Sequence, residues 1–346
     1  MTPPAPTDCA GALPRRVVVT GGAGFIGANL CRALAGVVEE LLVLDDLSTG
    51  RLDNLDDLHG VTVVEGSILD AGALRDVLDG ADAVVHLAAR PSVARSIEDP
   101  GATHAVNATG TLRVLQAAVE AGRPHVIVAS SSSVYGGSAV LPAREEAAPC
   151  PRSPYAASKL AAEGYARAYQ ESFGLPVLCF RFFNVFGPLQ RADHAYAAVV
   201  PAFVSAALRH EPLPVHGDGS QTRDFTFVGS VVAVLVDALV RRVVAPGPVN
   251  LAFGGRCSVL ELAGALEAVL GRSLPRHHLD PRPGDVRDSQ ADRTRLGELF
   301  PDLDPVALEE GLRRTISFVE RQRDASAPLE PVGILLGGPG SPLSQS

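Results

Sequence analysis

No apolar run in this 346-residue sequence reaches the roughly 18 to 20 residues that a helix needs to span a bilayer. Residues 1–14 also lack a basic segment followed by an apolar one, so we expect no secretory signal. The net charge of −9 argues against a general nucleic-acid-binding surface, although a few arginines in one cleft would suffice to hold a diphosphate. These absences predict a cytoplasmic globular protein that binds neither membranes nor nucleic acid.

Cysteine is scarce and scattered, at Cys9, Cys31, Cys150, Cys179 and Cys257. No two of them form a CxxC pair, and no Cys/His cluster has the spacing of a metal site. We therefore expect neither a disulfide framework nor a bound metal. Cys31 and Cys179 lie among apolar residues and are predicted to be buried small hydrophobic side chains rather than reactive thiols.

The first half of the chain alternates short, β-branched apolar runs with longer amphipathic stretches. The runs predict strands at 16–20, 41–44, 61–64, 83–87, 125–129 and 177–180, with a helix at about 25–35 after the first of them. Continuous apolar strands separated by helices are typical of parallel strands that are covered on both faces. The pattern predicts an α/β fold with a Rossmann-type, doubly wound parallel sheet.

Regularity weakens after about residue 183, where prolines and glycines become frequent. A helix is expected at 199–209, a strand at 249–251 and a helix at 259–270. We expect a Rossmann domain over 15–182, with elements near 226–255 returning to it, and a smaller α/β C-terminal lobe that is built mainly from 183–321. The Pro-, Gly- and Ser-rich tails, 1–14 and 322–346, are predicted to be disordered.

A glycine-rich turn follows the first expected strand, with Gly21, Gly24 and Gly27 in a GxxGxxG spacing. Small residues are needed there because the turn is tight, a pyrophosphate must approach the backbone and the helix must pack closely on the sheet. The N-terminus of that helix also offers free N–H groups and a positive dipole end to phosphates. Glycines placed between a strand and a helix therefore predict a dinucleotide site.

The second expected strand ends in Asp45 and Asp46, eighteen residues after Gly27. A carboxylate at this place accepts hydrogen bonds from the adenosine ribose and repels a 2′-phosphate. The pattern therefore predicts NAD rather than NADP as the cofactor. The alternative is that the two carboxylates only cap an exposed loop.

A YxxxK pair, Tyr155 and Lys159, is the candidate catalytic pair. Residues four apart lie on one face of a helix, and a nearby ammonium is expected to lower the pKa of the phenol toward the working pH. A run of serines, 130–133, lies directly after the expected strand 125–129, where strand ends face the ligand crevice of a doubly wound sheet. A hydroxyl there is expected to bind the reacting substrate oxygen and to pass its proton to Tyr155.

Taken together and in this order, the motifs resemble those of the extended short-chain dehydrogenase/reductase family, and most closely its nucleotide-sugar 4-epimerases. The resemblance covers roughly residues 15–320. It rests on GGAGFIG (21–27), HLAA (86–89), Asn107, SSSSVYG (130–136), YxxxK (155–159), FFNVFG (182–187) and RDF (223–225).

The resemblance implies Tyr155 as the base, Lys159 bonded to the nicotinamide ribose, and Ser131 as the hydroxyl partner. It further implies an NAD site that is lined by Gly21, Gly24, Phe25, Ile26, Gly27, Asp45, Asp46, Ser67, Ile68, Leu87, Ala88, Ala89 and Asn107. The substrate would be held by Ser131, Ser132, Asn184, Arg223, Arg282, Asp285 and Ser289. Both arginines are expected in loops, a setting suited to phosphate binding.

The implied activity is NAD-dependent 4-epimerisation of a UDP-hexose through a transient 4-keto sugar. Dehydratases of the family carry Thr-Asp-Glu before the Val-Tyr-Gly motif and decarboxylases carry a Glu, whereas this chain has Ser131–Ser133. Dehydration, decarboxylation and epimerisation of a hexuronate remain alternatives within the family. An ordinary dehydrogenase that releases NADH and a non-catalytic NAD-sensing regulator are the alternatives of other kinds.

Two residues predict the substrate range by the same resemblance. Ser289, seven places after Arg282, is small where glucose-restricted epimerases tend to carry Tyr, and Asn184 replaces the Thr that is usual in the hexuronate branch. We expect both the UDP-glucose/galactose and the UDP-GlcNAc/GalNAc pairs to be substrates, unless Ser289 only starts a helix and faces solvent. The family also implies a homodimer that forms through helices near 101–121 and 154–171.

Overall fold

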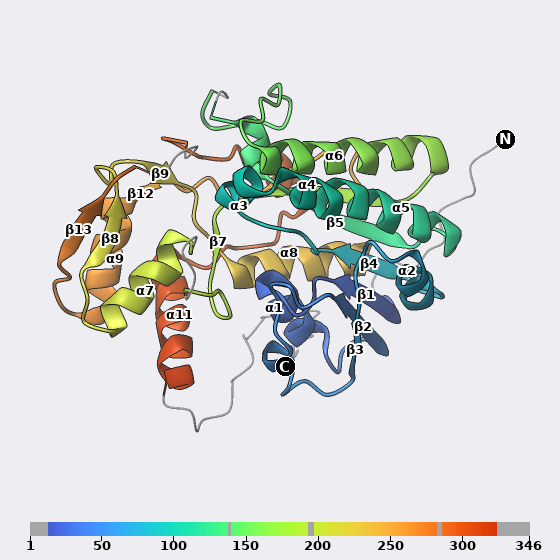
Figure 1. Ribbon diagram of the computed structural model, residues 1–346, viewed down its shortest axis with the longest axis horizontal. Coiled ribbons are helices and arrows are strands. Elements are labelled where there is room, and N and C mark those ends of the chain that lie inside the picture. Colours follow the sequence, from blue (N-terminus) through green and yellow to red (C-terminus); the bar gives the residue numbers. More distant parts are fainter. Residues whose placement is uncertain (1–12, 138–139, 193–196, 282–285, 324–346) are drawn as a thin grey trace, which may run out of the picture.

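A seven-stranded parallel sheet forms the centre of the computed structural model, which describes residues 13–137, 140–192, 197–281 and 286–323 (Figure 1). The strand order is β11-β6-β5-β4-β1-β2-β3, and every neighbouring pair is parallel. The strands are β1 (Arg16–Thr20), β2 (Glu40–Asp45), β3 (Val61–Glu65), β4 (Ala83–His86), β5 (His125–Ser131), β6 (Val177–Phe182) and β11 (Val249–Leu251). All seven strands predicted from the sequence are present, and β5 and β6 each extend two residues beyond the predicted end.

Helices cover both faces of this sheet, because successive strand residues point to opposite sides. Val17 and Val19 pack in a core with α1 (Phe25–Leu34) and α8 (Val228–Arg241), whereas Val18 packs on the other face. That second face is covered by α2 (Ala71–Leu78), α5 (Thr111–Glu120) and α6 (Pro154–Phe173), which Figure 1 shows on the side opposite α1 and α8. The predicted doubly wound Rossmann-type fold is confirmed.

The longest of these helices, α6, has well-defined ends. The Ser153 side chain accepts a hydrogen bond from the N–H of Ala156 at 3.1 Å, Pro154 occupies the first turn, and Gly174 ends the helix in the left-handed conformation. These signals fix the start of α6 and so place Tyr155 and Lys159 in its first two turns.

Shorter helical elements also lie between the strands. They are η1 (Leu52–Asn54), α3 (Val93–Glu98), α4 (Pro100–His104), the π-helical turn η2 (Ala105–Gly110) and the 3₁₀ turn η3 (Ser132–Tyr135). The segment from α3 to α5 packs against α6, so the expected dimer-forming stretches 101–121 and 154–171 are neighbours in space.

A smaller α/β lobe lies beyond the carboxyl end of β6, on the left in Figure 1. Its strands form three two-stranded sheets, which pair segments that are far apart in the sequence. The elements are β7 (Val185–Phe186), α7 (Val199–Leu208), β8 (Leu213–His216), β9 (Thr222–Arg223), β10 (Thr226–Phe227), β12 (Cys257–Ser258), α9 (Val259–Leu270), β13 (Arg276–Leu279), α10 (Thr294–Leu299) and α11 (Leu308–Arg323). The helix predicted at 259–270 is observed with those bounds.

The chain passes between the sheet and the lobe more than once. After β10 it returns through α8, which packs on α1, and β11, which pairs with β6, before it enters the lobe again at β12.

In the part of the chain that the structure describes, no helix is long and apolar enough to cross a membrane. Cys31 and Cys179 are buried free thiols, as predicted, and burial raises the pKa of Cys31 to about 12.

Candidate functional site

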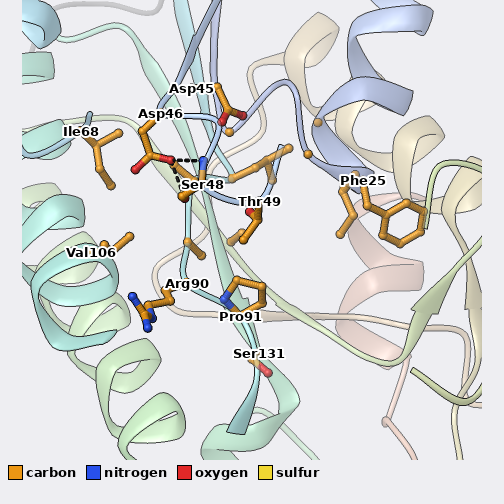
Figure 2. Close-up of a pocket in the computed structure, with 18 of the residues that line it drawn as sticks. Phe25, Asp45, Asp46, Ser48, Thr49, Ile68, Arg90, Pro91, Val106 and Ser131 are labelled. Carbon is orange, nitrogen blue, oxygen red and sulfur yellow. Dashed lines mark hydrogen bonds between the residues drawn. The ribbon is translucent and has the colours of Figure 1, made fainter. Parts of the chain in front are cut away.

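A cavity of about 690 Å³ runs along the carboxyl ends of the central strands. This is within the range of volumes of small-molecule sites. Figure 2 shows Asp45 and Asp46 at one end of this cavity and Ser131 at the other. Of the residues predicted for cofactor binding and catalysis, the cavity is lined by Gly21, Gly24, Phe25, Ile26, Gly27, Asp45, Asp46, Ile68, Leu87, Ala88, Ala89, Ser131, Tyr155 and Lys159.

The glycine turn at this cavity has the close contacts that require glycine. Gly21 has φ +74°, and a Cβ atom there would lie 2.6 Å from the backbone nitrogen of Ala88. A Cβ atom on Gly27 would lie 2.2 Å from the carbonyl oxygen of Gly21. Any side chain would therefore push the β1–α1 turn away from β4 and from the first turn of α1. The first turn of α1 lines the cavity, and the N-terminus of a helix, with its unpaired N–H groups, is the arrangement that holds a pyrophosphate.

Asp45 joins the end of β2 to the glycine turn. One carboxylate oxygen accepts a hydrogen bond from the N–H of Ala23 at 2.9 Å and the other from the N–H of Leu47 at 2.9 Å. Burial raises the pKa of Asp45, and the two backbone donors oppose that effect. Each oxygen keeps further acceptor capacity toward the cavity, as a ribose diol requires. Asp46 is exposed and accepts hydrogen bonds from the N–H and hydroxyl of Ser48 (Figure 2).

Two residues predicted to line the NAD site do not belong to the described lining of this cavity. The Ser67 hydroxyl accepts a hydrogen bond from the N–H of Leu69, and only its neighbours Gly66 and Ile68 face the cavity. Asn107 is fully buried in η2. Its side chain accepts from the N–H of Arg90 at 2.7 Å and donates to the Arg90 carbonyl at 3.2 Å and to the Ser158 hydroxyl at 3.0 Å. Asn107 therefore supports the wall from behind and is not part of its surface.

Half of the residues that line this cavity were not predicted from the sequence, and they include Ser48, Thr49, Arg90, Pro91, Arg95, Glu98 and Val106. Ser48 and Thr49 follow β2, and Arg90 and Pro91 follow the HLAA motif after β4. The rule that ligands bind at the carboxyl ends of parallel strands would have indicated these four. Arg95, Glu98 and Val106 come from helical segments, and no local signal marks them.

A second cavity, of about 470 Å³, opens between the sheet and the C-terminal lobe. It is lined by five residues that were predicted to hold the substrate: Ser131, Ser132, Asn184, Arg223 and Ser289. The two cavities share Ser131, Tyr155 and Phe182. The predicted catalytic tyrosine and serine therefore lie where the two spaces meet.

The Tyr155 phenol and the Ser131 hydroxyl are hydrogen-bonded to each other. Lys159 is buried, and its ammonium group donates to the carbonyl oxygen of Ala129 at 2.9 Å. Burial lowers the pKa of Lys159 to about 8. The pKa of Tyr155 is raised, because burial outweighs the hydrogen bond from Ser131, so the expectation of a lowered phenol pKa is wrong for the protein without ligands.

Asn184 and Arg223 come from short strands and turns of the lobe. Asn184 has φ +33°, an uncommon conformation for a residue other than glycine, and such strain often occurs at functional sites. Arg223 lies in β9 and is only 8% exposed, so the prediction that it lies in a loop is wrong. One guanidinium nitrogen donates to the carbonyls of Thr222 and Arg287 at 2.8 and 3.1 Å.

Ser289 lies in an extended segment next to β9. Its N–H donates to the Thr222 carbonyl at 3.1 Å, and the preceding Asp288 forms a parallel bridge with Thr222. Ser289 therefore does not start a helix, and it lines the second cavity. Arg282 and Asp285, also predicted to hold the substrate, lie outside the described residues.

A third cavity, of about 210 Å³, continues from the second and shares Asn184, Ala198 and Arg223 with it. Most of its walls are apolar, with Val199, Pro214, Phe225 and Val259 among them. Among the described residues, no group of three or more His, Cys, Asp or Glu side chains could hold a metal ion.

Comparison with known proteins places these features in context. Residues 17–252 match the model of the NAD dependent epimerase/dehydratase family. A UDP-glucose 4-epimerase of Mycolicibacterium smegmatis is 38% identical over 316 residues, which cover 88% of this chain and 98% of that protein. Curated relatives also include a UDP-glucuronate 4-epimerase at 30% identity and a UDP-N-acetyl-alpha-D-glucosaminuronate decarboxylase at 32% identity.

Solved structures match over nearly their full length. A UDP-N-acetylglucosamine 4-epimerase from Methanobrevibacter ruminantium, in complex with UDP-N-acetylmuramic acid, has a TM-score of 0.84 and 35% identity, covering 89% of this chain and 99% of that one. A UDP-glucose 4-epimerase from Thermus thermophilus, in complex with NAD, has a TM-score of 0.79 and 33% identity, covering 88% and 99%. An NDP-hexosamine 5,6-dehydratase is also similar, at 35% identity and a TM-score of 0.79.

Proposed function

Because the chain belongs to the NAD-dependent epimerase/dehydratase family, we propose that it is a 4-epimerase of UDP-linked hexoses. As a member of this family, the chain is an NAD-dependent enzyme that acts on nucleotide sugars. The family includes epimerases, dehydratases and decarboxylases, so the choice among these reactions depends on the side chains around the sugar.

The composition of the second cavity favours epimerisation. Among its described lining residues, Asp288 is the only carboxylic acid. Its carboxylate accepts a hydrogen bond from the Thr222 hydroxyl at 2.6 Å and lies 3.5 Å from the Arg256 guanidinium, so its pKa is lowered and it stays ionised. The serines at 131–133 occupy the place where the resembling dehydratases and decarboxylases carry an acid. The described lining of this cavity therefore offers no un-ionised carboxylic acid to protonate a leaving 6-hydroxyl, whereas epimerisation needs only a base for the 4-hydroxyl.

In the proposed reaction, Tyr155 takes the proton of the sugar 4-hydroxyl and later returns it, while Ser131 binds the same oxygen. NAD supplies the hydride acceptor and donor, and it ends the cycle unchanged. Lys159, one turn after Tyr155 on α6, is proposed to bind the nicotinamide ribose, and its positive charge would favour the phenolate over the phenol during proton transfer. The 4-keto sugar is proposed to turn over beside Ser131, Tyr155 and Phe182, where the two cavities meet.

The rest of the nucleotide sugar is proposed to lie along the second and third cavities. By resemblance, Asn184, Arg223, Arg282 and Asp285 would hold the nucleotide diphosphate, with the arginines at its phosphates, and the apolar third cavity suits a nucleobase. Ser289 leaves room beside the sugar, which supports use of both plain hexoses and N-acetylhexosamines, and Asn184 disfavours hexuronates. A homodimer through the helices of 101–121 and 154–171 is also proposed, and the aromatic side chains of Tyr165 and Phe173, both on α6, are exposed.

The test is incubation of the purified protein with UDP-glucose, UDP-galactose, UDP-GlcNAc, UDP-GalNAc and UDP-glucuronate, without added cofactor. Product analysis by NMR should show interconversion at C4 for the first two pairs and no net NADH release. Loss of water, loss of CO₂ or stoichiometric NADH in solution would instead assign a dehydratase, a decarboxylase or an ordinary dehydrogenase. No turnover of any UDP- or dTDP-sugar would contradict the proposal.

A further inference from the structure

Glu163 is a buried carboxylate that none of the proposed catalytic or binding steps uses. It lies on α6, four residues after Lys159, is 7% exposed and does not line any of the three cavities described above. Both carboxylate oxygens are engaged. Arg181 donates to them from Nε at 2.9 Å and from Nη2 at 2.8 Å, and the Ser130 hydroxyl donates to one of the same oxygens.

The partners of Glu163 are the neighbours of site residues. Ser130 precedes Ser131 on β5, and Arg181 precedes Phe182 on β6. In the β5–β6 pairing, Ser130 lies opposite Arg181 and Ser131 opposite Phe182. One carboxylate therefore attaches both strands to the helix that carries Tyr155 and Lys159, directly behind the junction of the two cavities.

The same carboxylate acts on the charge of Lys159. Burial favours loss of the Lys159 proton, and the negative charge of Glu163 opposes it. The other titratable groups that face Lys159 are the Cys179 thiol from β6 and His86 from β4. Burial raises the pKa of Cys179 and lowers the pKa of His86 to about 3, so His86 is neutral. Arg181 adds a positive charge from β6 that Glu163 neutralises.

A purely structural role would give the Glu163–Arg181 pair little influence on the site, because a buried ion pair contributes little net stability once its desolvation is included. The position of the pair beside Ser131 and Phe182 suggests a further role. We propose that Glu163 is a positioning residue, which holds Ser131 opposite Tyr155 and places a negative charge one helical turn from the Lys159 ammonium group. This inference rests on the proposed roles of Ser131, Tyr155 and Lys159.

The composition of the chain allows a direct test, because Lys159 is the only lysine in the 346-residue sequence. Protein labelled with [ε-¹³C]lysine therefore gives a single side-chain NMR signal, whose titration reports Lys159 alone. We expect Glu163→Gln to lower the titration midpoint by about one pH unit and to move the alkaline limb of the kcat/KM profile in the same direction. We also expect a roughly 10- to 100-fold loss of kcat, because Ser131 and Tyr155 are no longer held in register.

Three variants separate charge from geometry. Glu163→Asp keeps the charge but shortens the reach, so it should restore the Lys159 midpoint while kcat stays reduced. Ser130→Ala removes one hydrogen bond and should leave the midpoint unchanged, as should Glu171→Gln at an exposed position of the same helix. If Glu163→Gln does not fold because Arg181 is left unpaired, Glu163→Gln with Arg181→Met removes both charges. Its Lys159 midpoint should lie below that of the wild type but above that of Glu163→Gln alone, because the positive charge of Arg181 is removed as well.

A Lys159 midpoint that is the same in wild type and in both Gln-containing variants would overturn the inference, even if the protein is an active epimerase. A lowered midpoint in a protein that turns over no nucleotide sugar would instead leave the electrostatic role of Glu163 intact and contradict the proposed function. The two failures are therefore distinguishable.

Discussion

Two regions face each other across Ser131, Tyr155 and Phe182, and they are built in different ways. On the cofactor side, most lining residues directly follow the strands of one continuous sheet. On the substrate side, Asn184, Arg223 and Ser289 come from segments that lie tens of residues apart and meet through two-residue strands and a single bridge. Long strands position the residues on the cofactor side (the cofactor wall), and a few hydrogen bonds position those on the substrate side (the substrate wall).

Asp224 makes some of the hydrogen bonds that hold the substrate wall together. It is buried next to Arg223, and its carboxylate accepts hydrogen bonds from the N–H groups of Gly254 and Ala291, both at 3.1 Å. It thereby attaches the segment that carries Ser289 to the loop after β11. We infer that the substrate wall can change its specificity residues with little effect on the sheet, whereas the cofactor wall cannot.

The largest expected effect concerns Tyr155, which lies where the cofactor and substrate cavities meet. Tyr155→Phe should lower turnover by roughly 10²- to 10⁴-fold, because the general base is lost. The fold should be unchanged, as judged by circular dichroism, and bound NAD should be retained. Tyr165→Phe, at an exposed position of the same helix, is the control and should have wild-type activity. Near wild-type turnover in Tyr155→Phe would rule out the mechanism.

A second prediction tests whether the substrate wall sets specificity by itself. Ser289→Tyr should lower kcat/KM for UDP-GlcNAc and UDP-GalNAc by roughly 10- to 200-fold and spare the glucose pair, since the added ring overfills only the larger ligand's site. Ser289→Ala should leave both activities intact. If the two activities fall together, or neither changes, Ser289 does not border the sugar 2-position.

A third prediction concerns the opposite end of the cofactor wall. Mass analysis of the denatured wild-type protein should find bound NAD and little NADP, because Asp45 repels a 2′-phosphate. Asp45→Asn removes the charge and should raise the share of NADP, whereas Asp56→Asn, at an exposed position, should not. NADP in excess over NAD in the wild type would contradict the assignment.

The smallest expected effect is the pH dependence of the free energy of unfolding, to which buried groups of the two regions contribute with opposite signs. His86 on β4 and His125 on β5 are buried, and burial lowers their pKa values to about 3 and about 4. The unfolded chain therefore binds more protons than the folded protein below about pH 6.5, so each histidine should remove about 1–2 kcal/mol of stability between pH 8 and pH 5. Burial raises the pKa of Asp224 to about 6, so its contribution has the opposite sign and grows as the pH falls through 6.

Urea unfolding at pH 8 and pH 5 measures this balance. The wild type should lose stability at pH 5, His86→Gln should lose less, and Asp224→Asn should lose more than the wild type does. A free energy of unfolding that does not depend on pH in all three proteins would show that these groups are not buried in solution as they are in the structure.

The sequence predicted residues well where one strand positions one residue. Gly21, Asp45 and Ser131 each end or follow a single strand, and YxxxK needs only the period of a helix, so local patterns sufficed. Local patterns did not predict that Asn107 lies behind the lining of the cofactor cavity, because a π-helical turn brings its amide to the Arg90 backbone. The Glu163–Arg181 pair and the strand environment of Arg223 depend on pairings between distant segments, which no local period specifies.

The interleaving of the chain also limits how such a protein can be taken apart. β11 is a strand of the large sheet, and α8 covers that sheet next to α1. Lobe elements both precede them (β7 to β10) and follow them (β12 and α9), so no single cut separates the sheet from the lobe. A fragment that ends after β6 lacks the edge strand and the helix that covers α1, and a fragment that starts there lacks most of the sheet. New substrate preferences can therefore be grafted as individual loops or single residues, but not as a terminal module exchanged by one crossover.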